Sequence, residues 1–215
     1  MKEQSGFLGM LKLGIILAVF ATAACVMLAF VYTGTEKIIA QRQQDDLEAA
    51  LKELFPAADS FKETSEIKSS DTSVTIESGY AVIKNGKTAG AVLRLSRASY
   101  GGPIKILTGV NIDGSIAGVK IMEHQDTPGL GANAASPSYF VDRARGITFY
   151  GQFTGKKVSD PFEVKNDVVA ITASTITSRA VSAAVKAAGL GAIEWFGKAD
   201  TSDAGTQGVN TGVRQ

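Results

Sequence analysis

The uncharged apolar run from Leu13 to Tyr32 (LGIILAVFATAACVMLAFVY) constrains the fold of this chain more than any other feature. Its length matches that of a helix that crosses the hydrocarbon core of a bilayer, about 20 residues. A helix satisfies all of its backbone polar groups within one segment, as lipid requires. The sequence therefore predicts one membrane-spanning helix, with the lipid bilayer as a partner.

The residues that flank this run predict its orientation. Lys2 and Lys12 precede it, and positive charge favours the cytoplasmic side. We therefore expect a single-pass protein of the inner (cytoplasmic) membrane whose C-terminal domain is extracytoplasmic.

A cleaved signal peptide is the alternative, because Ala21-Thr22-Ala23 resembles a cleavage site. The apolar run, however, continues to Tyr32, which suits a retained anchor. The same continuation argues against a lipoprotein with Cys25 at its mature end, and Thr22 stands where a large aliphatic residue is expected.

Composition excludes several classes of function. The 215 residues carry a formal net charge of +1, which provides no basic face for nucleic acid. One cysteine and one histidine allow no internal disulfide and no cluster of metal ligands. We therefore predict no nucleic-acid partner, no metal site and no catalytic residue.

The segments after the apolar run predict an α+β fold. Residues 35–55 have the spacing of an amphipathic helix that ends at Pro56, and residues 57–73 form a polar surface connection. Asn85-Gly86 stands between two apolar runs, and Asp113-Gly114 stands between two more. This pattern predicts two successive hairpins and therefore a curved antiparallel sheet.

The C-terminal half predicts flanking helices. Ser136-Pro137 favours a helix over SYFVDRAR, and DPFEVKNDVVAI favours a strand. A further helix, SRAVSAAVKAAG, is expected to be capped by Ser178 and closed by Gly189. The predicted division is a cytoplasmic N-terminus (1–12), a transmembrane helix (13–32), an amphipathic helix and connection (33–73), a folded domain (74–196) and a flexible tail (197–215).

A run of hydroxyl residues, AITASTITS (170–178), precedes this last helix. Ser and Thr commonly cap helices, and that ordinary role explains the run without a ligand. The start of a helix also offers unpaired N–H groups to an anion, so that a phosphate site is the alternative.

Two segments, YGGPIKILTGVNIDGSIAGVKIMEHQDTPGLG and AITASTITSRAV, resemble the FMN-binding domain family. The similarity extends from about Tyr80 to Gly191. Within the family, the chain is similar to the G subunits of Rnf-type (Rsx) electron-transport complexes. The related C subunits of sodium-pumping NADH:quinone reductases are usually longer.

The resemblance implies covalent FMN. In the family, the last threonine of a Ser/Thr-Gly-Ala-Thr motif is esterified to the flavin phosphate by a separate flavin transferase. In this sequence Thr172 takes the first place, Ala173 the glycine, Ser174 the alanine and Thr175 the flavin-bearing place, with Thr177 as a support. If the glycine position has a positive φ, alanine there is costly and attachment could decrease.

The resemblance also implies that the loop after the second hairpin faces the flavin. The residues assigned to it are Glu123, Thr127, Gly129, Leu130 and Gly131. For other residues nearby we expect ordinary roles: Asp126 as a solvated loop carboxylate, His124 as a structural or exposed residue, and Trp195 and Phe196 as core.

The implied function is that of an electron-carrying subunit that is not catalytic alone. Its implied partners are the other membrane subunits of an Rnf-type complex, which passes electrons between ferredoxin and NAD⁺ and moves ions. The residues that would hold the FMN are Glu123, Thr127, Gly129, Leu130, Gly131, Thr172, Ser174, Thr175 and Thr177. The alternative is a membrane-anchored sensor or partner-binding module of the same fold that has lost flavin.

Overall fold

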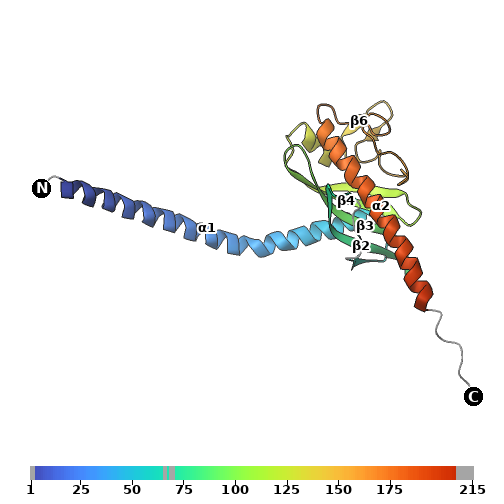
Figure 1. Ribbon diagram of the computed structural model, residues 1–215, viewed down its shortest axis with the longest axis horizontal. Helices are drawn as coiled ribbons and strands as arrows, with labels where there is room; N and C mark the ends of the chain where they lie inside the picture. Colours follow the sequence, from blue (N-terminus) through green and yellow to red (C-terminus); the bar gives the residue numbers. More distant parts are fainter. Residues whose placement is uncertain (1–2, 65–66, 68–70, 207–215) are drawn as a thin grey trace, which may run out of the picture. The chain divides into compact units, whose positions relative to one another are not determined.

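The computed structural model describes residues 3–64, 67 and 71–206 (Figure 1). The chain divides into two compact units, Met1–Ala49 and Ala50–Gln215. Over its described residues the first unit is helical and consists of most of α1 (Glu3–Leu54). The second unit contains the end of α1, a five-stranded sheet and helix α2 (Thr175–Thr206).

Helix α1 is long and apolar enough to cross a membrane. Large apolar side chains remain exposed along it, among them Leu17, Phe20, Leu28 and Phe30. A helix that is apolar on all sides suits lipid better than water. The Thr22 hydroxyl donates to the carbonyl of Ala18 one turn earlier, at 2.8 Å, and is thereby satisfied without water.

The predicted span and the predicted amphipathic helix form one continuous helix, because α1 continues to Leu54 without interruption. The Thr35 hydroxyl donates to the carbonyl of Val31 at 2.8 Å, inside the continuous helix. The predicted end at Pro56 is confirmed: Leu54 is the last helical residue, and a proline disfavours helical backbone at the residue before it.

The sheet is an antiparallel meander in the order β1-β2-β3-β4-β5. Its strands are β1 (Ser60–Thr64), β2 (Val74–Lys84), β3 (Lys87–Ala98), β4 (Pro103–Asn111) and β5 (Ile116–Glu123). Strand β1 occupies part of 57–73, which the sequence had predicted as a connection only; its residues alternate weakly in burial, as expected of an edge strand.

Both predicted hairpins are confirmed. Asn85 and Gly86 have φ values of 52° and 74°, as the two-residue type I′ turn requires. In the turn between β4 and β5, the Asp113 carboxylate accepts a hydrogen bond from Ser115 N at 2.9 Å. These local turns fix the register of the strands that support the rest of the domain.

Helix α2 packs against one face of the sheet (Figure 1). The core there joins Leu93 and Leu95 of β3 and Ile106 of β4 to Val181 and Val185 of α2, all buried. The alternate residues of the strands face the other way. On that second face Gly109 lies so close to Phe55 that an added Cβ would be 2.9 Å from its ring, so the last turn of α1 covers this side within the same unit.

The helix predicted after Ser136-Pro137 is wrong. The chain forms a short 3₁₀ helix, η1 (Gly131–Ala135), and then a small hairpin of β6 (Phe140–Asp142) and β7 (Ile147–Thr148). Asp142 accepts bonds from Arg145 N at 3.0 Å and Arg145 Nε at 2.7 Å. This turn, with Gly146 at a φ of 66°, replaces helical hydrogen bonds.

The strand predicted in DPFEVKNDVVAI is also wrong. Phe162 and Lys165 have φ values of 56° and 79°, which a strand does not accommodate. The Asp167 carboxylate instead accepts bonds from Phe162 N at 3.1 Å and Glu163 N at 2.6 Å, and pairs with Lys156 at 2.8 Å. The segment therefore forms a turn that the Asp167 carboxylate closes, although its apolar residues alternate as in a strand.

Helix α2 is longer than predicted at both ends. It begins at Thr175, so that Ser178 lies inside it and is not its cap. Gly189 does not end it; an added Cβ there would be 2.4 Å from Val158, so this glycine permits close packing. The helix continues to Thr206, into the range expected to be a flexible tail, and 207–215 lie outside the described residues. Trp195 and Phe196 are buried core residues, as predicted.

Candidate functional site

The turn that leads into α2 contains a residue in an unfavourable conformation. Ala173 has a φ of 59°, in the left-handed region that costs a non-glycine residue roughly 1–2 kcal/mol. Ser178, fully buried one turn into the helix, accepts a bond from Ile171 N at 3.0 Å and donates to Ser174 O at 2.9 Å. These two bonds hold the turn against the start of the helix.

We expect Ala173→Gly to raise the free energy of unfolding by about 0.5–1 kcal/mol. Glycine removes the left-handed penalty, and the greater freedom of the unfolded chain offsets part of this gain. Ala187→Gly, in the interior of α2, is the matched control and should lower it by about 1 kcal/mol or more. Urea unfolding measures both; a loss of stability in both variants would contradict the prediction.

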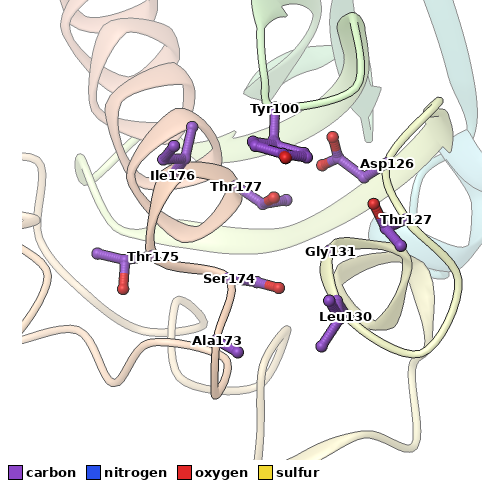
Figure 2. Close-up of a pocket in the computed structure, with 10 residues that line it drawn as sticks. All are labelled: Tyr100, Asp126, Thr127, Leu130, Gly131, Ala173, Ser174, Thr175, Ile176 and Thr177. Atoms are coloured by element: carbon purple, nitrogen blue, oxygen red, sulfur yellow. The ribbon is translucent and has the colours of Figure 1, made fainter.

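A pocket of about 550 Å³ opens beside this turn (Figure 2). It is lined by Tyr100, Asp126, Thr127, Leu130, Gly131, Ala173, Ser174, Thr175, Ile176 and Thr177. These residues come from three segments: the loop between β3 and β4, the loop after β5, and the start of α2. Such a volume is ordinary for a small-molecule site.

The lining of the pocket has an apolar side and a polar side. Tyr100 and Ile176 are 70% and 56% exposed, and Leu130 is also exposed, so that each presents an apolar surface. The polar side is made of hydroxyls at the helix start, where the first backbone N–H groups have no partner within the helix. Such a lining suits a ligand with a flat apolar body and an anionic group.

The hydroxyls at the helix start point in different directions. Figure 2 shows Ser174 and Thr177 directed toward the loop of Leu130 and Gly131, whereas Thr175 extends to the other side of the chain in this view. Ser174 O accepts the first bond of the helix, from Ser178 N at 3.0 Å, so Ser174 occupies the N-cap position. Thr175 is the first helical residue and is half-buried.

Asp126 is not the solvated carboxylate that the sequence suggested; it is 5% exposed. It accepts bonds from Ser99 Oγ and Gly101 N, both at 2.7 Å, and from the Thr177 hydroxyl. Burial raises its pKa, but these three hydrogen bonds outweigh burial and lower the pKa below the ordinary value. The pocket wall therefore contains a carboxylate that is ionised at neutral pH.

The structure brings together most of the predicted site residues. Those that line the pocket are Thr127, Leu130, Gly131, Ser174, Thr175 and Thr177. Thr172 and Gly129 belong to the same two loops but are not in the lining. Glu123 is not in it either: its carboxylate pairs with Lys105 at 2.8 Å and with Arg94 at 3.5 Å. His124 is half-buried next to Glu123 and lines a separate, open hollow.

Sequence reasoning missed Tyr100, Asp126 and Ile176 as lining residues. Tyr100 opens the first segment of the resemblance, and the glycine pair after it marked a tight turn. Asp126 stands directly before TPGLG, but a carboxylate in a polar loop gives no sign of burial until its partners are placed. Among the described residues no group of three or more potential metal ligands occurs.

The family match of the segment that contains the pocket defines the class of this protein, which is an FMN-binding domain protein. Residues 99–189 match the model of the FMN-binding domain family, and every residue that lines the pocket falls within that match. Residues 1–54, which cover α1, match the model of the RnfG N-terminal region.

Relatives extend this match over most of the chain. The G subunit of the proton-translocating ferredoxin:NAD(+) oxidoreductase complex of Clostridium ljungdahlii is 34% identical over 76% of this chain and 80% of its own length. The corresponding Na(+)-translocating protein of Acetobacterium woodii is 34% identical over 86% and 92%. The G subunit of an ion-translocating oxidoreductase complex of Aliivibrio fischeri is 33% identical over 88% and 90%. The chain belongs to this family of G subunits.

Among solved structures, the crystal structure of Shewanella oneidensis NqrC matches this chain with a TM-score of 0.44 and 20% identity. The match covers 68% of this chain and 73% of that chain.

Proposed function

We propose that this protein is a membrane-anchored flavoprotein that relays electrons within an ion-translocating ferredoxin:NAD⁺ oxidoreductase complex. The observation that carries the proposal is the pocket at the start of α2, all of whose lining lies in the FMN-binding domain match. The relatives from Clostridium ljungdahlii and Acetobacterium woodii are named as subunits of such complexes. The other membrane subunits are therefore its partners, and the protein is not catalytic alone.

The residues of the pocket fit FMN. Tyr100, Leu130 and Ile176 offer exposed apolar surface on which a flat ring system can lie. The start of α2 offers backbone N–H groups and hydroxyls to a phosphate. When bound, FMN supplies the capacity to accept and pass on one or two electrons; the protein's residues bind and orient it.

We place the covalent attachment at the hydroxyl of Thr175, through a phosphoester. The turn before it has the shape expected of the family motif, because Ala173 adopts a positive φ although it is not glycine. The only carboxylate of the lining, Asp126, is already engaged by Ser99, Gly101 and Thr177. A threonine hydroxyl needs activation to attack phosphorus, so a separate flavin transferase would supply both the base and the flavin donor.

Covalent flavin separates this proposal from a module of the same fold without a redox role. Protein produced together with a working flavin transferase should be yellow, should fluoresce under ultraviolet light in a denaturing gel, and should gain the mass of FMN minus water. Protein that is colourless and of unmodified mass under these conditions would favour the module without flavin.

The location of the folded domain is a further prediction. We propose that 1–12 are cytoplasmic, that 13–32 span the inner membrane, and that 33–215, which include the flavin domain, are extracytoplasmic, because Lys12 precedes the span. Protease added to intact spheroplasts should digest the domain while a cytoplasmic marker survives. Digestion only after lysis would show the opposite orientation.

A further inference from the structure

The pocket is assembled from three segments that are distant in sequence, and Asp126 lies where they meet. One segment contributes Tyr100, the second extends from Asp126 to Gly131, and the third from Ala173 to Thr177. Their backbones approach closely: an added Cβ at Gly101 would be 2.1 Å from the carbonyl oxygen of Gln125. The walls of the pocket therefore depend on contacts that hold these segments together.

The Asp126 carboxylate bonds to both of the other segments. Its Oδ2 accepts from Ser99 Oγ and its Oδ1 from Gly101 N, each at 2.7 Å, so it holds the residues on both sides of Tyr100. It also accepts from the hydroxyl of Thr177, which is buried in the first turn of α2. Hydrogen bonds to an ionised group are short and strong, and this geometry fixes the aromatic wall relative to the helix start.

The Asp126 carboxylate also places a negative charge in the wall of the pocket, where an uncharged side chain could fill the same space. Burying an ionised group is costly unless hydrogen bonds satisfy it, and three donors satisfy this one. No lysine, arginine or histidine lines the pocket; the charge of His124, outside the lining, is the weakest of the interactions that lower the pKa of Asp126. Reduction adds negative charge to a flavin, so an adjacent anion opposes it, more strongly in a poorly solvated site than in water.

We propose that Asp126 is a positioning residue of the flavin site, which locks the Tyr100 loop to the first turn of α2 and holds a fixed negative charge that lowers the flavin reduction potential. The inference rests on the proposed binding of FMN in this pocket. If Asp126 had a purely structural role, its hydrogen bonds would hold the pocket together but its charge would not affect the reduction potential of the flavin.

Asp126→Asn separates the charge from the bonds. The amide keeps the shape of the carboxylate, and its oxygen still accepts from Gly101 N–H while its nitrogen donates to Ser99 Oγ. Asp126→Ala removes both charge and bonds. Asp113→Asn is the matched control, because Asp113 also accepts from a backbone N–H and from a serine hydroxyl. A Cβ added at Gly114, in the same turn, would be 3.3 Å from Ile193. Ile193 lies about 27 Å along α2 from Thr175, at 1.5 Å per residue.

Two measurements on the full chain decide the proposal. Potentiometric titration of the flavin-loaded protein should give a more positive potential for Asp126→Asn than for wild type, with no change for Asp113→Asn. Amide hydrogen exchange of flavin-free protein should show Gly101 exchanging about tenfold faster or more in Asp126→Ala, and nearly as slowly as wild type in Asp126→Asn.

Each result has a definite consequence. Equal potentials in wild type and Asp126→Asn would overturn the role of the charge, and unchanged exchange of Gly101 in Asp126→Ala would overturn the positioning role. Wild-type protein that never acquires flavin would overturn the proposed function, and with it the effect on the potential. In that case the hydrogen-exchange rate of Gly101 would still test whether Asp126 holds the Tyr100 loop in place.

Discussion

Thr175→Ala is expected to abolish covalent flavin while the domain remains folded. Thr175 is the first residue of α2 and is half-buried, and alanine has a high helix propensity. The free energy of unfolding should therefore change by less than about 0.5 kcal/mol. Intact-mass analysis should lose the increase of FMN minus water, and fluorescence in a denaturing gel should disappear.

The neighbouring hydroxyls provide the controls for Thr175. In Figure 2 the Ser174 and Thr177 hydroxyls face the loop of Leu130 more directly than Thr175 does, so peptide mass mapping is needed to establish the attachment site. Thr177→Ala should keep the flavin but lose about 2 kcal/mol of stability, because the hydroxyl donates to the charged Asp126. Flavin found on Ser174 or Thr177 would contradict the assignment.

Sequence predicts the parts of this fold that depend on local chemistry. Asn85-Gly86 sets its hairpin because both residues tolerate a positive φ, and the apolar stripe of α2 includes Val181 and Val185, which are buried against the sheet. The length of the apolar run at 13–32 predicted, in the same direct way, a helix that is long and apolar enough to cross a membrane.

The sequence prediction fails where a side-chain carboxylate closes a turn inside a segment whose pattern resembles a helix or a strand. The segment 161–169 has the alternation of a strand, but Asp167 closes it into a turn through Lys156 and two backbone amides. The segment after Ser136-Pro137 begins like a helix, but Asp142 and Gly146 turn it into a hairpin. In both cases one carboxylate supplies hydrogen bonds that no periodicity in the sequence reveals.

The residues of the pocket also include some that the sequence predicted and some that it did not. The resemblance led to Thr175, Gly131 and Thr127 because they lie within recognisable motifs, and all three line the pocket. It did not lead to Asp126, because the buried state of this carboxylate depends on Ser99 and Thr177, which are far from it in sequence. Tyr100 was missed for a similar reason: a side chain that is 70% exposed on a loop becomes part of a pocket only through the segments opposite it.

Gly131→Ala is expected to distort the pocket more than any other single added methyl group in the loop after β5. An added Cβ at Gly131 would be 2.7 Å from both Asp126 Cβ and Thr177 Oγ1. Neither neighbour is the end of a long flexible side chain, so the loop and the helix start must move apart. Overpacking of this kind costs about 1–3 kcal/mol, and the displacement should weaken the bond between Thr177 and Asp126.

Gly129→Ala is the matched control, because it adds the same methyl group two residues earlier. Gly129 has a φ of 77° and open space around its Cβ position, so alanine there costs roughly 1–2 kcal/mol of backbone strain and creates no clash. Both variants should lose similar stability, but only Gly131→Ala should shift the visible absorbance of the flavin. An unchanged spectrum in folded Gly131→Ala protein would remove this loop from the site, because a distorted wall cannot leave a ring that lies against it in an unaltered environment.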